Sequence, residues 1–495
     1  MTKPAIAKKH TSHWLILILI ALAQFMVVLD ISIVNVALPS MQRAFSLSTA
    51  DLQWIISAYT LAFGGFLLLG GRTADYFGRR LAFLSGISVF TLASLGTGLS
   101  QSGTMLITFR AIQGLAAAFM SPAALSIVLV TYKEGHERNV ALSVWGAVAS
   151  GGAAVGVLLG GIITQYLTWR WNFFINLPVG IFVILFSLRL LGHYKTESER
   201  RSLDLPGAAS VTGGLMAIVY ALTEAPVYGW GSARILITLI IGVLLVVFFV
   251  VNESRAKHPL MPLRVFKIRN IAGANSLMLL LAAGLFSVFF FTTLYLQDVL
   301  HYSPVRTGLD FLVMPLIIAS VASTIPRLIR RIGYKPILIV APLLVSAGLF
   351  LIARIPVDGS FWGNVAPGLM VMGLGMGALF VAVTIAATSG VPQHEAGLAS
   401  GLLNTSQQIG GALGLAILTG VLSSSISNYL RALHLHAQPS AAAIAAANVH
   451  GFHNGYLLAS GFAFLASMIA IFFIKKSKAA NDPSHKEIST PGLAV

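Results

Sequence analysis

The 495-residue chain contains no cysteine, and only 10% of its residues are charged. The absence of cysteine excludes a disulfide framework, a thiolate nucleophile and a cysteine metal site. A soluble globular domain carries about 25% charged residues, so the shortage of charge excludes an ordinary soluble enzyme. Hydrophobic residues make up 56% of the chain and form long runs. Because a helix that crosses a membrane needs about 20 apolar residues, the sequence predicts a polytopic membrane protein.

Motifs for nucleotide or metal chemistry are also missing. The chain has no P-loop pattern G-x-x-x-x-G-K-[ST], and its glycine-rich stretches lie inside apolar runs. The histidines between residues 425 and 454 lack a metal-site spacing such as H-E-x-x-H. We therefore expect no direct use of ATP, no cofactor, no metal site and no enzymatic activity.

Fourteen apolar stretches are long enough to span a membrane and predict an all-α fold. They lie at 14–38, 52–71, 81–100, 104–130, 140–164, 172–193, 207–226, 234–252, 272–296, 306–326, 336–354, 364–389, 397–424 and 455–474. The intervening stretch 425–454, rich in Ala and Ser, is expected to be the longest outer loop.

The distribution of basic residues predicts the orientation. With the N-terminus inside, 25 of the 32 Lys and Arg residues fall in inner segments, as the positive-inside rule requires. Both termini are thus expected in the cytoplasm, in a multi-pass protein of the plasma (inner) membrane. The formal charge of +16 then reflects topology and the lipid bilayer as partner, and no nucleic acid is needed to explain it. We expect a monomer.

A weak internal repeat indicates two related halves, as in many transporters. The glycine and basic residues at 78–80 recur at 333–335, an offset of 255. An acid followed by two glycines recurs at an offset of 258, from Glu137, Gly152 and Gly156 to Glu395, Gly410 and Gly414. The expected organisation is a cytoplasmic N-terminus (1–13), a six-helix bundle (14–193), an inserted helix pair (207–252), a second six-helix bundle (272–474) and a cytoplasmic tail (479–495).

Ionisable residues inside a span are costly and usually functional. Asp30 lies about 12 Å below the outer end of the first helix, and Arg110 lies about 9 Å below the outer end of the fourth, from the rise of a helix. These matched depths allow an ion pair that protonation of Asp30 would break. The alternative is a static structural pair.

The segment GRTADYFGRR (71–80) joins the second and third helices on the cytoplasmic side. Gly71 and Gly78 permit a tight turn, and Asp75 could cap a helix or pair with an arginine. In the simpler interpretation the basic residues of this segment, Arg79 and Arg80 among them, only fix the topology.

The fifth helix carries a stripe of small residues, Gly152, Gly156, Gly160 and Gly161. Such stripes allow close helix contact, and composition alone favours packing over a direct role in transport. Asp310, about one turn into the tenth helix, faces either a cavity or the membrane boundary.

Several motifs together resemble the Major Facilitator Superfamily, in particular its fourteen-helix drug:proton antiporters, which include the quaternary-ammonium and multidrug efflux pumps. The resemblance covers about residues 14–475. The motifs are LDISIVNVALP (29–39), GRTADYFGRR (71–80), RAIQGLAAA (110–118), WRWNFFINLPVG (169–180) and DLPGA (204–208), together with the glycines of the fifth helix.

The resemblance implies a fold of two six-helix bundles plus two inserted helices, and roles for individual residues. Asp30 would be the proton-linked acid with Arg110 as its partner, and Gly71, Asp75, Gly78, Arg79 and Arg80 would form a cytoplasmic gate. The glycines of the fifth helix would mark the antiporter helix, although Val157 stands where the family has proline. Candidate residues for the substrate cavity are Asn35, Tyr59, Gln113 and Asp310.

The leading hypothesis is a proton-coupled exporter of small amphipathic compounds, some of them cationic, that works by alternating access of its two halves. A proton-linked symporter or facilitator for a small metabolite is the first alternative, and the missing proline favours it. A lipid translocase or a receptor that reuses the fold is the second, since fold does not fix function.

The charge distribution yields a direct prediction of topology. A reporter fused after Lys478 should behave as cytoplasmic, because an even number of spans returns the chain to the basic side. Paired alkaline phosphatase and fluorescent protein fusions at this site measure it. An extracellular signal there would refute the count of fourteen spans.

Overall fold

The computed structural model describes residues 13–132, 136–192, 204–256, 259–389, 396–433 and 438–475. Within these ranges the regular secondary structure is helical, and no strand occurs. The tail 479–495 and all but the last residue of the N-terminal segment 1–13 lie outside the described residues.

Fourteen stretches of the described chain are helical, long and apolar enough to cross a membrane, which confirms the predicted all-α fold with fourteen spans. The single-helix spans are α1 (His13–Phe45), α2 (Thr49–Phe77), α3 (Arg79–Gly98), α4 (Gly103–Thr131), α5 (His136–Tyr166), α8 (Leu205–Tyr228), α9 (Ala233–Arg255), α13 (Tyr334–Ile352), α15 (Ala396–Ala432) and α16 (Ala441–Phe473). The others are composed of α6 and α7 (Trp171–Phe174 and Asn176–Leu190), α10 and the π-helix η2 (Arg269–Leu294 and Tyr295–Val299), α11 and α12 (Pro304–Phe311 and Val313–Ile332), and the π-helix η3 and α14 (Phe361–Val365 and Ala366–Thr388). A short 3-10 helix, η1 (Leu263–Lys267), precedes α10.

Serine residues start many of these helices. Five of them, at the starts of α2, α4, α9, α11 and α16, accept a hydrogen bond from the backbone N–H three residues later: Ser48, Ser102, Ser232, Ser303 and Ser440. This is the standard side-chain cap of a helix N-terminus. Between α2 and α3, Gly78 has a φ of 101°, a conformation that side chains disfavour, so the chain turns there without a loop.

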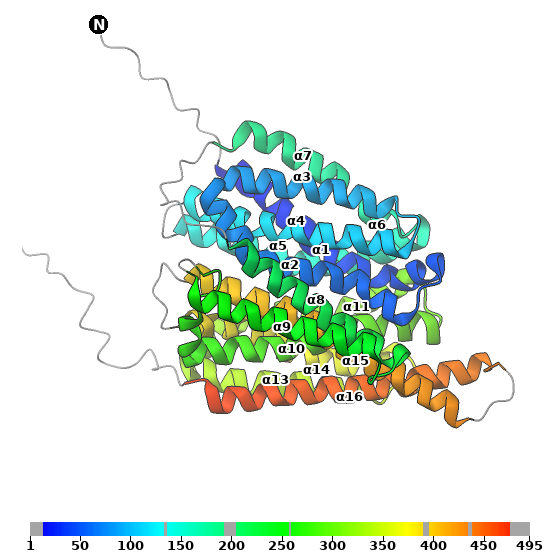
Figure 1. Cartoon of the computed structure of the whole chain (residues 1–495). Coiled ribbons are helices and arrows are strands. Elements are labelled where there is room, and N and C mark those ends of the chain that lie inside the picture. The colour runs from blue at the N-terminus through cyan, green and yellow to red at the C-terminus, as the bar shows by residue number, and fades with distance from the viewer. Residues whose placement is uncertain are drawn as a thin grey trace, which may run out of the picture. The chain divides into compact units, whose positions relative to one another are not determined.

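The prediction of a long outer loop at 425–454 is wrong. Helix α15 continues to Ala432, and α16 already begins at Ala441. In Figure 1 these two helices extend past the ends of α13 and α14 in the same unit. The Ala-rich sequence of this region forms helix well, so the two helices that contain the last two candidate spans extend into it.

Contacts divide the described chain into two units. The first contains the residues up to Met261 together with Thr292–Leu312, and the second contains Pro262–Phe291 and the residues from Val313 onward. The inserted helices α8 and α9 pack against each other, and α8 also packs on α2, so the pair belongs to the first unit. Within that unit α3 lies beside α4 and α7 (Figure 1).

The glycines of the internal repeat have the same structural role in both units. In the first unit, a Cβ on Gly156 of α5 would lie 2.7 Å from Ser32 of α1. In the second, a Cβ on Gly414 of α15 would lie 2.0 Å from Ala283 of α10. The fifth helix of each half therefore packs directly on the first helix of that half, and only glycine allows this distance.

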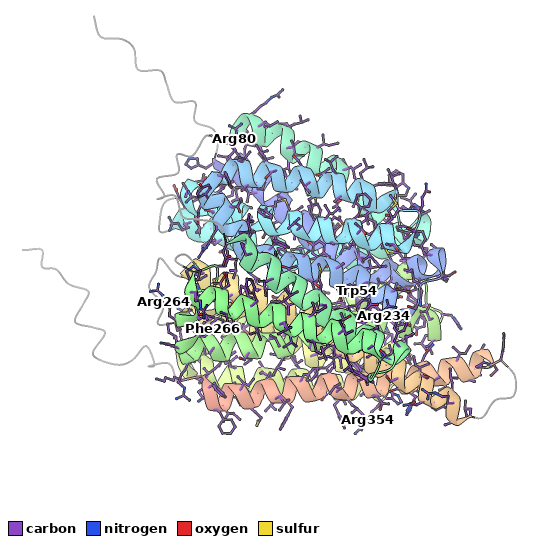
Figure 2. All side chains as sticks on the ribbon, viewed as in Figure 1. Trp54, Arg80, Arg234, Arg264, Phe266 and Arg354 are labelled. Carbon is purple, nitrogen blue, oxygen red and sulfur yellow. The ribbon has the colours of Figure 1, made fainter. Side chains whose placement is uncertain are left out.

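The basic residues of the repeat also correspond. Arg80 Nη2 donates a hydrogen bond to Leu188 O near the end of α7 (2.7 Å), and Lys335 Nζ donates to Ile471 O near the end of α16 (2.9 Å). A cation at the C-terminus of a helix satisfies unpaired carbonyl groups and opposes the helix dipole. Figure 2 shows Arg80 at one end of the first unit and Arg234 at the opposite end.

Two glycines of α5 provide a test of this packing. A Cβ on Gly160 would lie 2.7 Å from Ile33 O of α1, whereas a Cβ on Gly151 meets nothing within 4 Å. We expect Gly160→Ala to destabilise the protein by about 1–3 kcal/mol through overpacking, and Gly151→Ala to be neutral or slightly stabilising. Thermal unfolding of the purified variants measures this. Equal effects of the two substitutions would contradict the close contact.

Candidate functional site

Asp30 is fully buried within the first unit and is surrounded by hydrogen-bond donors. Its Oδ2 accepts a hydrogen bond from Arg110 Nη1, which forms an ion pair. Its Oδ1 accepts from Gln113 Nε2 (3.1 Å) and from Asn176 Nδ2 (3.0 Å). One carboxylate of α1 is thus held by side chains of α4 and α7, and its charge is compensated directly, as a buried charge requires.

Arg110 has further partners beyond that carboxylate. Its Nε donates to Ile55 O of α2 (3.1 Å), and its Nη1 also donates to Gln113 Oε1 (3.1 Å). The guanidinium lies over the Tyr59 ring, 4.4 Å from its centroid, and 5.9 Å from the centroid of Phe173. Because aromatic faces attract cations, the guanidinium retains favourable contacts whether or not the carboxylate is ionised.

Neutral polar side chains complete the site. Gln113 Nε2 also donates to Ser94 Oγ of α3 (2.8 Å), and Thr97 Oγ1 donates to Gln113 Oε1 (3.2 Å). Asn176 Nδ2 lies 3.4 Å from the same Ser94 Oγ. We call Asp30 and these five residues (Ser94, Thr97, Arg110, Gln113, Asn176) the Asp30 cluster. Such connected networks fix the rotamers of their members.

Helix packing explains why the cluster can form. A Cβ on Gly114 of α4 would lie 2.2 Å from Tyr59 O of α2, so these two helices approach closely only because that residue is glycine. The approach brings the residue before it, Gln113, and Arg110 one turn earlier against α2 and α1. The sequence motif RAIQG thus combines the polar side chains with the glycine that lets them reach Asp30.

The four candidate cavity residues occupy different places. Gln113 belongs to the Asp30 cluster, and Tyr59 is fully buried beneath Arg110. Asn35 donates to the backbone of its own helix (3.0 Å). Asp310 of α11 is 9% exposed, and one of its carboxylate oxygens has no hydrogen-bond partner in the described chain. No hydrogen bond between described residues links Asn35 or Asp310 to the cluster.

The candidate gate residues lie around the junction of α2 and α3. Gly71 lies in α2 where it passes α4, and Asp75 is an exposed residue near the end of α2. Gly78 makes the turn, and Arg79 is the first residue of α3. Arg80 caps α7, as described above. The junction is therefore a compact turn in which Arg80 is tethered to α7.

Three members of the cluster were not among the residues predicted from the sequence with a role. Asn176 lies within the motif WRWNFFINLPVG, and Ser94 and Thr97 lie within the third span. Polar residues inside apolar spans are the signal that points to them. The described residues contain no group of three or more His, Asp or Glu side chains that could hold a metal ion.

The ion pair predicts a non-additive effect of two substitutions on stability. Arg110→Ala leaves the buried Asp30 carboxylate without the cation that neutralises it, so we expect a loss of about 3–5 kcal/mol of stability. The double variant Asp30→Asn/Arg110→Ala has no charge to strand and should be more stable than the single variant. Thermal unfolding of both purified variants in detergent measures this. A double variant no more stable than Arg110→Ala would contradict the prediction.

Comparison with known proteins agrees with this architecture. Residues 20–415 match the family model of the Major Facilitator Superfamily. The puromycin resistance protein pur8 of Streptomyces alboniger is 42% identical over 482 residues, covering 97% of this chain and 95% of that protein. The cephamycin export protein CmcT of Amycolatopsis lactamdurans is 39% identical over 414 residues, covering 83% of this chain and 85% of that protein.

Solved structures agree on the fold. The POT family transporter PepTSo superposes with a TM-score of 0.69 at 14% identity, over 95% of this chain and 98% of that one. At this identity the likeness concerns the fold alone. The family match and the two relatives, which extend over most of the chain, go further: this chain belongs to the Major Facilitator Superfamily of multi-span membrane transporters.

Proposed function

We propose that the protein exports small amphipathic toxic compounds, antibiotics among them, in exchange for protons. The names of its relatives support export: one is a puromycin resistance protein and another a cephamycin export protein. Proton coupling is our inference from the Asp30 cluster. Transport proceeds by alternating access of the two halves, with a monomer in the plasma membrane and both termini in the cytoplasm.

The observation that carries the proposal is the set of partners around Asp30 and Arg110. Protonation of Asp30 removes the ion pair, yet Arg110 keeps its bonds to Ile55 O and Gln113 and its contact with Tyr59. A static pair would not need these alternatives. The cluster therefore has two charge states that the same residues can accommodate, which a proton-driven cycle requires.

The other candidate residues complete the proposed cycle. Asp75, Arg79 and Arg80, with Gly71 and Gly78, would stabilise the state in which the cytoplasmic side is closed. Movement of α1 would be transmitted to α5, since Gly152, Gly156 and Gly160 of α5 all approach α1. Gly161 approaches Pro304 of α11 instead, so α5 contacts two neighbouring helices along its length.

The decisive experiment is uptake by inverted membrane vesicles with an acidic lumen, in which export from the cell becomes uptake. Puromycin, which the name of one relative includes, is a suitable labelled substrate. The native protein should accumulate it. Asp30→Asn mimics the protonated state permanently, so accumulation should fall to that of vesicles without the protein, while substrate counterflow without a gradient persists.

The control is Asp298→Asn, because Asp298 is an exposed carboxylate at the end of the ninth span and its loss should leave accumulation unchanged. Accumulation by Asp30→Asn at the native rate would eliminate Asp30 as the coupling residue. Accumulation driven only by an alkaline lumen would indicate a symporter. Absence of both accumulation and counterflow of any tested drug would favour a lipid translocase or a receptor.

A further inference from the structure

Helices α1 and α5 approach each other progressively. A Cβ on Gly146 of α5 would meet nothing within 4 Å, and one on Gly152 would lie 3.3 Å from Val28. Further along, the Cβ distances fall to 2.7 Å at both Gly156 and Gly160. The two helices are therefore in close contact from Gly152 onward. Towards the N-terminal half of α1 they separate.

An apolar groove of about 310 Å³, open on one side and bordered by the exposed side chains of Trp14 and Ile18, occupies the space where they separate, and we call this groove the α1–α5 cavity. On α1 it extends from Trp14 to Phe25, and on α5 it is lined by Val144 and Val148. Every lining side chain is apolar. The cavity lies entirely within the first unit, and Phe25 forms its end nearest Gly152. A Cβ built on Gly152 would lie 3.4 Å from Phe25 Cδ2.

The corresponding place in the second unit is closed. A Cβ on Gly410, the counterpart of Gly152, would lie 2.2 Å from Leu279 O of α10. Ser406, which corresponds to Val148 at the same offset of 258, donates a hydrogen bond to Asn275 Oδ1 of α10 (2.8 Å). The second half thus holds the two helices together with a polar bridge where the first half has an apolar wall. The cavity is a feature of this half and not a requirement of the fold.

We propose that this α1–α5 cavity binds the apolar ring system of the exported compound, an assignment that rests on the export function proposed above. Ligand pockets typically measure about 300–1,000 Å³, so the cavity accommodates the ring portion of a drug-sized molecule. Trp14 and Phe25 provide aromatic faces at its two ends, which favour flat rings. The polar portion of the compound remains outside, since the lining offers it no hydrogen bond.

The position of the cavity connects it to the Asp30 cluster. Phe25 lies five residues before Asp30 on the same helix, and the close contact between Gly152 and α1 lies between the cavity and the cluster. A ring bound in the cavity would therefore contact α1, the helix that carries the proton-linked acid. This gives compounds of different polar chemistry a common way of acting on α1, provided that each has an apolar ring.

Adjacent residues of α5 allow a matched test. Val148→Trp fills the cavity, whereas Ala147→Trp adds the same ring at the neighbouring exposed position outside it. The probe is the neutral fluorescent compound N-phenylnaphthylamine, and its saturable binding to the purified full-length protein is measured by energy transfer from tryptophan. We expect Val148→Trp to weaken binding at least about tenfold, because the ring loses its buried apolar contact, and Ala147→Trp to bind as the native protein does.

The other outcomes overturn the proposal. Equal affinities of the native protein and Val148→Trp would remove the cavity as the binding site. An acyl chain would be the occupant if phospholipid displaced the probe at one lipid per protein. In that case the native protein would also co-purify with a lipid that Val148→Trp lacks. The binding assay uses no proton gradient and no transport, so loss of coupling in the transport assay of Asp30→Asn and loss of probe binding in Val148→Trp are separate results.

Discussion

A carboxylate within the apolar layer of a membrane must be surrounded by donors, and this requirement organises the first unit. Asp30 receives hydrogen bonds from α4 and α7, while the arginine that neutralises it is itself bound to the backbone of α2. Four helices are thus positioned by one negative charge. Glycines supply the other half of the arrangement, because the polar side chains reach Asp30 only where the helix backbones come into contact.

Helix α1 has two different faces as a result. One face carries Asp30 and is held by directional hydrogen bonds, which have few allowed geometries. The other packs on the glycines of α5 through van der Waals contact, which tolerates sliding more readily. A change of charge at Asp30 would alter the first set of contacts and leave the second intact. The two faces of α1 are therefore held by interactions of different kinds, one dependent on the charge of Asp30 and one independent of it.

The sequence was informative about positions along helices and less so about directions around them. The depths of Asp30 and Arg110 could be compared by counting residues, and this comparison pointed to their contact. The participation of Asn176 and Ser94 could not be derived in that way, because the partner of a side chain depends on the rotation and tilt of each helix, which tertiary packing decides. The cavity beside Val148 was equally inaccessible, since a space between helices leaves no residue pattern of its own.

The extent of α15 and α16 shows a different limit. Hydropathy detects where a helix lies in the apolar layer, but the backbone remains helical wherever its residues favour it. At a rise of 1.5 Å per residue, the 37 residues of α15 span about 55 Å and the 33 of α16 about 50 Å, against a hydrocarbon core of about 30 Å. This pair of helices is therefore long enough to extend beyond the hydrocarbon core as a rigid helical hairpin, against which an antibody fragment could be raised. The bound fragment would add mass outside the membrane, and single-particle imaging needs such a feature to align particles of a protein whose described residues form membrane helices.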